Sequence, residues 1–322
     1  MINYLIMQNN LAPICLFVYN RIEETKLTIK ALQANFLANE SDLIIFSDGC
    51  KGKNDADSIN KVRSFVRNIK GFKSVKIFES SENKGLAKSV IDGVSLVLEK
   101  FETIIVLEDD LITTPNFLDF MNQALSFYKD NEEVYSVNGF TLDIGCEEFV
   151  RLNDVFFHNR TYSWGWGTWS DKWCGDDFIN QNIRKYMDDR NLSLFKKNCG
   201  EDILRMLIDC MSGANDSWYV KWVFIHFIKN KLAVYPTLSK VRNIGYGDSA
   251  THCKTINVLE IKYDTQYSKD FTFPVKTKIN HRISKNFLSF FTFKHKLLFR
   301  FRLIFKSEGL NLLWKDIQYK YL

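Results

Sequence analysis

The stretch that most constrains how this chain can fold is Thr103–Leu111, which reads TIIVLEDDL. Five apolar or β-branched residues run directly into three carboxylates, Glu108, Asp109 and Asp110. An apolar run of this length predicts a strand buried on both faces of a parallel sheet. Acids just past the carboxyl end of such a strand lie where open α/β sheets bind ligands. Either they form a solvated turn, or a divalent cation offsets their mutual repulsion.

Strands and helices alternate along the first 130 residues. Beside the TIIVL run, the sequence predicts a buried strand at the apolar segment Pro13–Tyr19 and further strands at Leu43–Phe46 and Ser74–Phe78. Helical spacing of apolar residues predicts helices at Glu23–Leu37, Ala56–Ile69 and Gly85–Glu99, and a further helix from about Pro115. We therefore expect an α/β fold with a mostly parallel, doubly wound sheet flanked by helices and joined by right-handed crossovers.

Length and composition limit the number of domains and indicate the cellular compartment. The 322 residues allow one large or two modest domains. The seven Cys form no CxxC pair, which argues against a zinc site or a disulfide framework and favours reduced thiols. The N-terminal residues MINYLIMQNN lack the features of a signal peptide. No stretch approaches the ~18 apolar residues of a membrane span. We expect a cytoplasmic protein.

The positive charge is concentrated near the C-terminus. Residues 271–307 carry nine Lys or Arg and no acid, whereas the rest of the chain has 34 basic and 38 acidic residues. Asn286–Lys306 interleaves Phe, Leu and Ile with these basic residues. A helix of this kind suits the surface of an anionic membrane, which would place the protein peripherally on the inner face of the cell membrane through residues 276–306. The alternatives are docking on the rest of the chain or a dimer contact. The acidic remainder argues against a nucleic-acid partner.

Polar residues follow three of the expected strands. They are Asn20 with Arg21, then Asp48, then the three acids at 108–110. The carboxyl ends of parallel strands gather at one edge of the sheet, so these side chains should face one crevice. The chain has neither a GxGxxG nor a GxxxxGK[ST] motif. A nucleotide could still be held there if Asp48 accepts hydrogen bonds from its base or ribose and a metal joins its diphosphate to the acids.

The second half is rich in aromatic residues. Phe156–Trp173 carries four Trp with two Gly between them, and Trp218–Ile228 is expected to be an aromatic helix. The side chains of Trp164, Trp166 and Trp218 either pack in a core or form a wall on which a sugar ring stacks.

Two further features of this half have alternative explanations. Asp216, at the start of the expected helix, is either a helix cap or a catalytic acid. Asn243–His252 is Gly-rich and could be a mobile lid, in which His252 is either structural or a contact to metal or phosphate.

The motifs follow one another in an order that can be compared with known protein families. VYNR, SDG, NKGLAKSV and EDD precede the Gly/Trp segment, a D-x-W and a Gly-rich loop ending in His. The order resembles the GT-A-fold glycosyltransferases, in particular the inverting N-acetylglucosaminyltransferase I family and bacterial polysaccharide and O-antigen sugar transferases. The resemblance covers roughly residues 12–253. It implies a catalytic domain over 1–253, with a nucleotide-sugar-binding half (12–130) and an acceptor half (131–253). Residues 254–322 would be a basic extension.

The resemblance also implies a UDP-sugar donor, Mn²⁺ or Mg²⁺, and a glycan or lipid-linked saccharide acceptor in bacterial surface polysaccharide synthesis. The donor site would comprise Asn20, Arg21, Asp48, Lys88, Glu108, Asp109 and His252. Asp110 would bind the metal and Asp216 would be the general base. The family has two adjacent acids before the Trp, whereas here Ser217 follows Asp216, so Glu201 and Asp202 are retained as alternative bases.

The residue types suit this chemistry. Oxygen ligands favour Mn²⁺ or Mg²⁺ over zinc, and an acceptor hydroxyl needs a carboxylate to take its proton. One base opposite the leaving group would invert the configuration of the sugar. Two other functions remain open. A sugar-nucleotide nucleotidyltransferase would normally have a Gly-rich phosphate loop after the first strand. A non-catalytic glycan- or membrane-binding scaffold would retain the fold without turnover.

Overall fold

The structure, a computed structural model, describes residues 11–175, 182–245 and 261–305. The strands in these ranges are β1 (Ile14–Val18), β2 (Asp42–Ser47), β3 (Ser74–Glu79), β4 (Thr103–Glu108), β5 (Leu111–Thr113), β6 (Val134–Asn138), β7 (Val155–His158), β8 (Trp166–Trp169), β9 (Leu232–Pro236) and β10 (Val241–Asn243). The α-helices are α2 (Ile22–Gln33), α3 (Ala56–Val66), α4 (Leu86–Leu98), α5 (Phe117–Phe127), α6 (Glu147–Leu152), α8 (Asp189–Cys199), α9 (Glu201–Met211), α10 (Trp218–Ile228), α11 (His281–Ser289) and α12 (Phe293–Leu303). Short 3₁₀ turns occur at η1 (Ala38–Glu40), η2 (Lys53–Asp55) and η3 (Asn182–Tyr186).

Eight strands form one sheet in the order β3-β2-β1-β4-β8-β6-β9-β7. The pairs among β3, β2, β1 and β4 are parallel, as is the β6–β9 pair, whereas β8 and β7 run antiparallel to their neighbours. The expected α/β fold with a mostly parallel sheet is therefore confirmed. A separate antiparallel pair joins β5 to β10.

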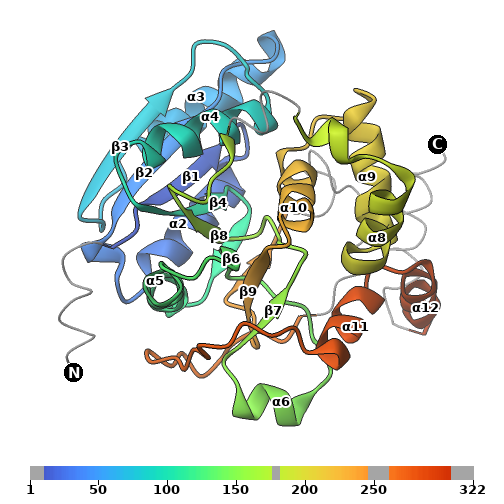
Figure 1. Cartoon of the computed structure of the whole chain (residues 1–322). Helices are drawn as coiled ribbons and strands as arrows, with labels where there is room; N and C mark the ends of the chain where they lie inside the picture. Colours follow the sequence, from blue (N-terminus) through green and yellow to red (C-terminus); the bar gives the residue numbers. More distant parts are fainter. Residues whose placement is uncertain (1–10, 176–181, 246–260, 306–322) are drawn as a thin grey trace.

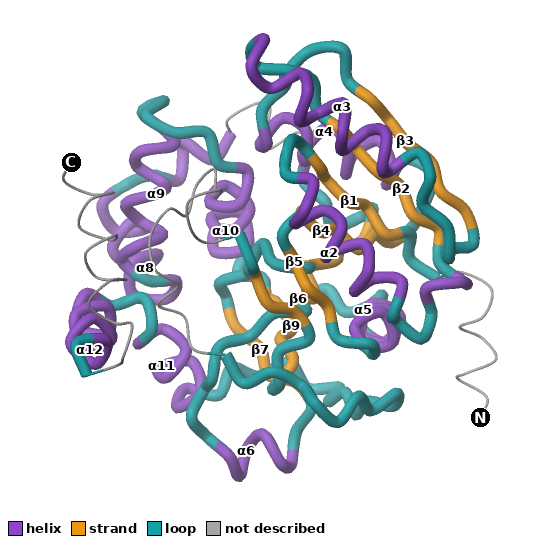
Figure 2. The backbone as a smooth tube through the Cα atoms, turned by 180° about the vertical axis from the view of Figure 1, so that it is seen from behind, coloured by secondary structure: helices purple, strands orange, loops and turns teal. Residues whose placement is uncertain are grey.

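Helices cover both faces of the sheet, and the side chains of β1 alternate between the two layers. Ile14, Leu16 and Val18 pack with α2, α3 and α5, while Cys15 and Phe17 pack with α4 and α10. Figure 1 shows α4 in front of the sheet, and Figure 2, from behind, shows α2 and α5 on the opposite face. The alternation is what a strand buried on both faces requires, because successive side chains point to opposite sides.

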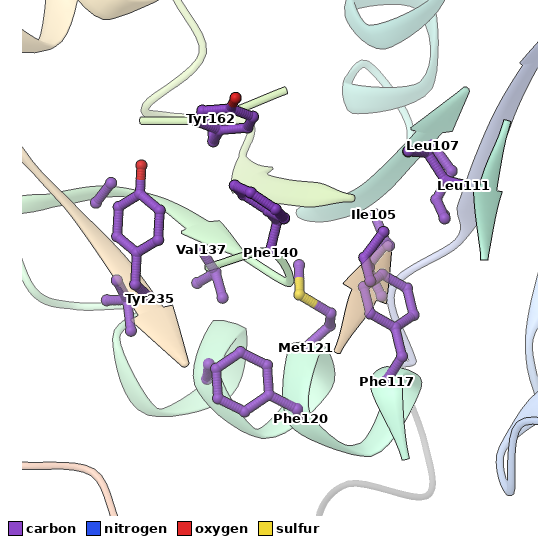
Figure 3. Packing of buried hydrophobic residues seen from close by; sticks show 14 of the residues in the cluster. Ile105, Leu107, Leu111, Phe117, Phe120, Met121, Val137, Phe140, Tyr162 and Tyr235 are labelled. Carbon is purple, nitrogen blue, oxygen red and sulfur yellow. The ribbon is translucent and has the colours of Figure 1, made fainter. Parts of the chain in front are cut away.

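The core is continuous across the middle of the sheet. Figure 3 shows Ile105 of β4 beside Phe117 of α5, with Met121 of α5 on the side towards Val137 of β6. Tyr235 of β9 lies beside Val137. All five side chains are fully buried. Residues from the first 130 positions and from the next 120 therefore share one hydrophobic core.

The C-terminal tail differs from the single helix expected over 286–306. It forms two helices: α11 ends at Ser289, and Thr292 caps α12 by accepting a hydrogen bond from the backbone N–H of His295 at 3.2 Å. α11 buries Ile283 and Phe287 against the main core. Of the alternatives that the sequence left open for the tail, α11 therefore follows docking on the rest of the chain. Within the described residues, no helix is both long and apolar enough to cross a bilayer.

Candidate active site

Arg21 joins the carboxyl ends of β1 and β4. It lies between these strands' ends at the start of α2, and its guanidinium forms ion pairs with Asp109 and, at 3.0 Å, with Asp110. The turn that carries the acids is fixed from α2 as well. Thr28 donates a hydrogen bond to the backbone oxygen of Asp109 at 2.8 Å and accepts one from the backbone N–H of Leu111 at 3.1 Å. These contacts bring Arg21 and the acids together, as the sequence predicts.

Burial shapes the electrostatics of this cluster. Glu108 has its pKa raised to about 8, first by burial and then by the neighbouring charges of Asp110 and Asp109. Burial also raises the pKa of Asp109 to about 6, although the charge of Arg21 opposes this shift. Burial alone would lower the pKa of Arg21, but the two aspartates raise it above its ordinary value. The cluster thus holds more negative charge than one guanidinium offsets.

One oxygen of Asp110, Oδ1, is buried and, among the described residues, has no hydrogen-bond partner. Its Oδ2 pairs with Arg21, and Gly245 lies so close that an added Cβ would be 1.9 Å from that atom. A buried carboxylate oxygen without a partner is costly unless a donor or a metal ion satisfies it. Asp110 therefore fits the role of a divalent-metal ligand.

Side chains of the described residues supply only part of a metal's coordination. No three His, Cys, Asp or Glu side chains in residues 11–175, 182–245 and 261–305 are grouped so as to hold an ion. Asp110 would accordingly give one ligand, and the other ligands would have to come from groups other than these side chains. His252, the other predicted contact, lies outside the described residues.

Asp48 has a different role from the one predicted. Its Oδ1 accepts backbone hydrogen bonds from Gly49 and Lys84, and its Oδ2 accepts them from the backbone of Gly85 and the side chain of Asn83. A carboxylate has about four acceptor positions, so these four donors leave none for a base or ribose. In this structure Asp48 instead fixes the loop that leads into α4, which corrects the assignment as a nucleotide contact.

Two other predicted donor contacts are engaged elsewhere. The side-chain amide of Asn20 donates to Asp55 at 3.5 Å, and the Tyr19 hydroxyl donates to the same carboxylate at 2.9 Å. Lys88 is exposed on α4 and pairs with Asp92 one turn further along at 3.1 Å. The contact of Asp55 with Asn20 and Tyr19 could not be predicted, because η2, which carries Asp55, has no apolar pattern that indicates its position.

The tryptophans divide between the two alternatives. Trp166 and Trp218 are only 0% and 3% exposed, and their rings stack on each other with centroids 5.1 Å apart. Neither side chain offers a free ring face, so the sugar-wall assignment is corrected to core packing for both. Trp164 is only partly buried and contacts the rings of Phe140 and Tyr162. It is the one member of the predicted wall that keeps exposed surface.

The same stack links the start of α10, which Asp216 precedes, to β4. Trp166 is paired in register with Val106 of β4, two residues before Glu108, and Trp218 stacks on it at the start of α10. Asp216 lies two residues before Trp218, and its side chain is 66% exposed, with Lys221 at 3.7 Å. The start of α10 therefore lies at the same edge of the sheet as the acids.

Asp216 is not the helix cap. Ser217 caps α10 by accepting a hydrogen bond from the backbone N–H of Val220 at 3.4 Å. Asp202, an alternative base, makes two 2.9 Å hydrogen bonds with the buried guanidinium of Arg160. That ion pair occupies both carboxylate oxygens of Asp202. Of these two acids, Asp216 is the one that keeps acceptor capacity facing solvent.

Comparison with known proteins does not assign this chain to a family. No protein-family model matches the sequence, and no curated protein matches it at a significant level. Solved structures share part of the architecture. A mannosyltransferase from Pyrobaculum calidifontis in complex with GDP-Man and Mn²⁺ has 8% identity and a TM-score of 0.34 over 50% of this chain and 45% of that chain.

Two further structures are similar to the same extent. Glucosyl-3-phosphoglycerate synthase from Mycobacterium tuberculosis, in complex with Mg²⁺ and UDP, has 11% identity and a TM-score of 0.32 over 53% of this chain and 61% of its own. TarS from S. aureus has 14% identity and a TM-score of 0.27 over 39% of this chain and 21% of its own. In each case the match spans less than two thirds of the other protein's length. These scores assign neither a family nor an activity to this chain.

Proposed function

We propose that this protein is an inverting, metal-dependent glycosyltransferase that transfers a hexosyl or N-acetylhexosaminyl group from a UDP-sugar. The acceptor would be a glycan or a lipid-linked saccharide in bacterial surface polysaccharide synthesis. The observation that carries the proposal is the buried Oδ1 of Asp110, which has no partner among the described residues. It lies at the edge of the sheet where open α/β folds bind ligands.

The chain's own residues would divide the work as follows. Asp110 would hold a Mn²⁺ or Mg²⁺ ion, which when bound supplies Lewis-acid stabilisation of charge on the departing diphosphate. Arg21, now paired with both aspartates, would remain beside the phosphates as a second positive charge. The partly buried ring of Trp164 is the candidate surface for a sugar.

Asp216 would act as the general base. Its exposed carboxylate, 3.7 Å from Lys221, would take the proton of an acceptor hydroxyl as that oxygen attacks the anomeric carbon. The Trp166–Trp218 stack would hold the start of α10 against the end of β4 that leads into the acids. A base that acts from the side of the sugar opposite the leaving group would invert the configuration.

The test is UDP release from a panel of UDP-sugars with Mn²⁺ and candidate saccharide acceptors, with NMR of the product. Asp110→Asn should abolish Mn²⁺-dependent donor binding in calorimetry, whereas Asp119→Asn, a change at a buried carboxylate on α5, should leave it intact. Asp216→Asn should keep donor binding and lose transfer. If no donor is turned over while glycans still bind, the scaffold alternative holds instead. If Asp216→Asn retains full transfer, the base has been misassigned.

A further inference from the structure

The outer face of α12 is the most apolar exposed surface among the described residues. Of 17 large hydrophobic side chains that are exposed there, six fall within residues 293–305. They are Phe293, Leu297, Leu298, Phe301, Ile304 and Phe305. The exposed fractions range from 46% for Ile304 to 80% for Phe293. The others are scattered along the chain, as is normal for a soluble surface. A concentration of this kind marks an interaction site.

The six side chains share one side of the helix. At about 3.6 residues per turn, they fall within an arc of about 140°. Arg300 and Lys296 border the arc on one side and Arg302 borders it on the other, while Lys294 lies inside it. The long stem of a lysine lets its ammonium reach outward from an apolar surface. The arrangement is an apolar stripe with cationic margins.

The opposite side of α12 is attached to the protein. Leu303 is only 4% exposed. The ring of His295 lies 4.7 Å from that of Phe290, at the end of α11. α11 is itself anchored in the main core through Phe287, which has no exposed surface. Figure 1 shows α12 at the periphery of the molecule, beyond α11. The helix therefore presents its apolar stripe outward from a fixed base.

We propose that α12 and the residues to Phe305 bind the surface of an anionic membrane, with the apolar stripe inserted between lipid headgroups. Charge complementarity selects this occupant, because residues 271–305 contain eight Lys or Arg and no acid. An apolar stripe with basic margins is the pattern of helices that lie in the membrane interface. A second copy of the chain would bring two sets of like charges together. A nucleic acid would engage the basic residues but not the apolar stripe.

The proposal extends the proposed function, because it would bring the active site to lipid-linked acceptors, but its test needs neither donor nor metal. The full-length protein is sedimented with vesicles of phosphatidylcholine alone or with about 30% phosphatidylglycerol, at low and high salt. We expect binding to the anionic vesicles and its loss at high salt. Phe293→Ser should weaken binding at least tenfold. The double variant Lys294→Gln/Lys296→Gln should weaken it by roughly 25-fold, at about fivefold per charge.

Matched controls separate α12 from general surface effects. Leu152→Ser changes an apolar side chain that is 67% exposed on α6, and Lys73→Gln removes a lysine that is 64% exposed next to β3. Neither should alter vesicle binding. Failure of the wild-type protein to bind anionic vesicles at micromolar concentration would overturn the proposal. So would binding that the α12 variants leave unchanged, or sedimentation velocity showing a dimer that Phe293→Ser dissociates. Donor hydrolysis is measured separately, so either outcome leaves the proposed function to its own test.

Discussion

Replacement of Arg21 by Met tests whether the carboxylate cluster takes up a divalent ion. The guanidinium is 15% exposed and its partners Asp109 and Asp110 are 4% and 9% exposed. Removing one partner of a buried ion pair costs about 3–5 kcal/mol, and we take the lower figure of about 3 kcal/mol because Arg21 is not fully enclosed. The Arg21→Met protein in EDTA should therefore unfold at a clearly lower urea concentration than the wild type.

Added Mn²⁺ should return most of this loss. An ion present at 100 times its dissociation constant stabilises the native state by about 2.7 kcal/mol. The wild type should gain less, because the positive charge of Arg21 already offsets part of the negative charge that attracts the ion. The control is Arg63→Met, whose guanidinium donates to the backbone oxygens of Asp48 and Ser80 and forms its ion pair with Glu79 at 3.7 Å. The reasoning is refuted if Mn²⁺ stabilises Arg21→Met no more than it stabilises Arg63→Met.

Two further predictions concern the loop over the acids and the response to acid. Gly245→Ala would place a Cβ 1.9 Å from Oδ2 of Asp110, so calorimetry should show that UDP binding with Mn²⁺ is weakened at least tenfold. The control Gly52→Ala, whose Cβ would have nothing within 4 Å, should not change the affinity. Equal affinities of the two variants would contradict the close packing of Gly245 on Asp110. Burial lowers the pKa of His158 and of His226 to about 3, below the ordinary 6.5, so each histidine binds fewer protons in the native state and its contribution to stability falls as the pH drops from 6.5 towards 3. At pH 5 this loss is about 2 kcal/mol for each histidine. The raised pKa values of Glu108 and Asp109 act in the opposite sense, so urea unfolding at pH 7 and pH 5 is compared between the wild type and His226→Gln; the same change in stability in both proteins would show that His226 charges freely.

The long apolar runs made the parallel half of the sheet predictable. Ser74–Phe78 and Thr103–Leu107 were expected as strands and are observed as β3 and β4, each one residue longer. The short strand β8 was not predictable in the same way. It is the four-residue sequence WGTW, which contains a Gly and has no alternating pattern, so it carries no local signal of a strand. Its strand state depends on β4 and β6, which it joins. Such pairing is tertiary and leaves no local signal.

The candidate site was predictable in its location but not in every contact. Polar residues at the ends of β1 and β4 were expected to meet, and Arg21 pairs with Asp109 and Asp110. The sequence could not reveal that backbone amides before α4 would saturate Asp48, because a peptide N–H is the same at every residue. It also could not separate packed from exposed indoles, since Trp164 and Trp166 are two positions apart and differ only in burial.

The position of β8 has a consequence for how this chain can be divided. The strand comes from the second half of the sequence, yet it fills the gap between β4 and β6. A fragment that stopped near residue 130 would leave the hydrogen-bonding groups along one side of β4 open to solvent. Open strand edges recruit other strands, so such a fragment should self-associate. Evolution or protein engineering could therefore exchange this segment between proteins only together with the strand that closes it.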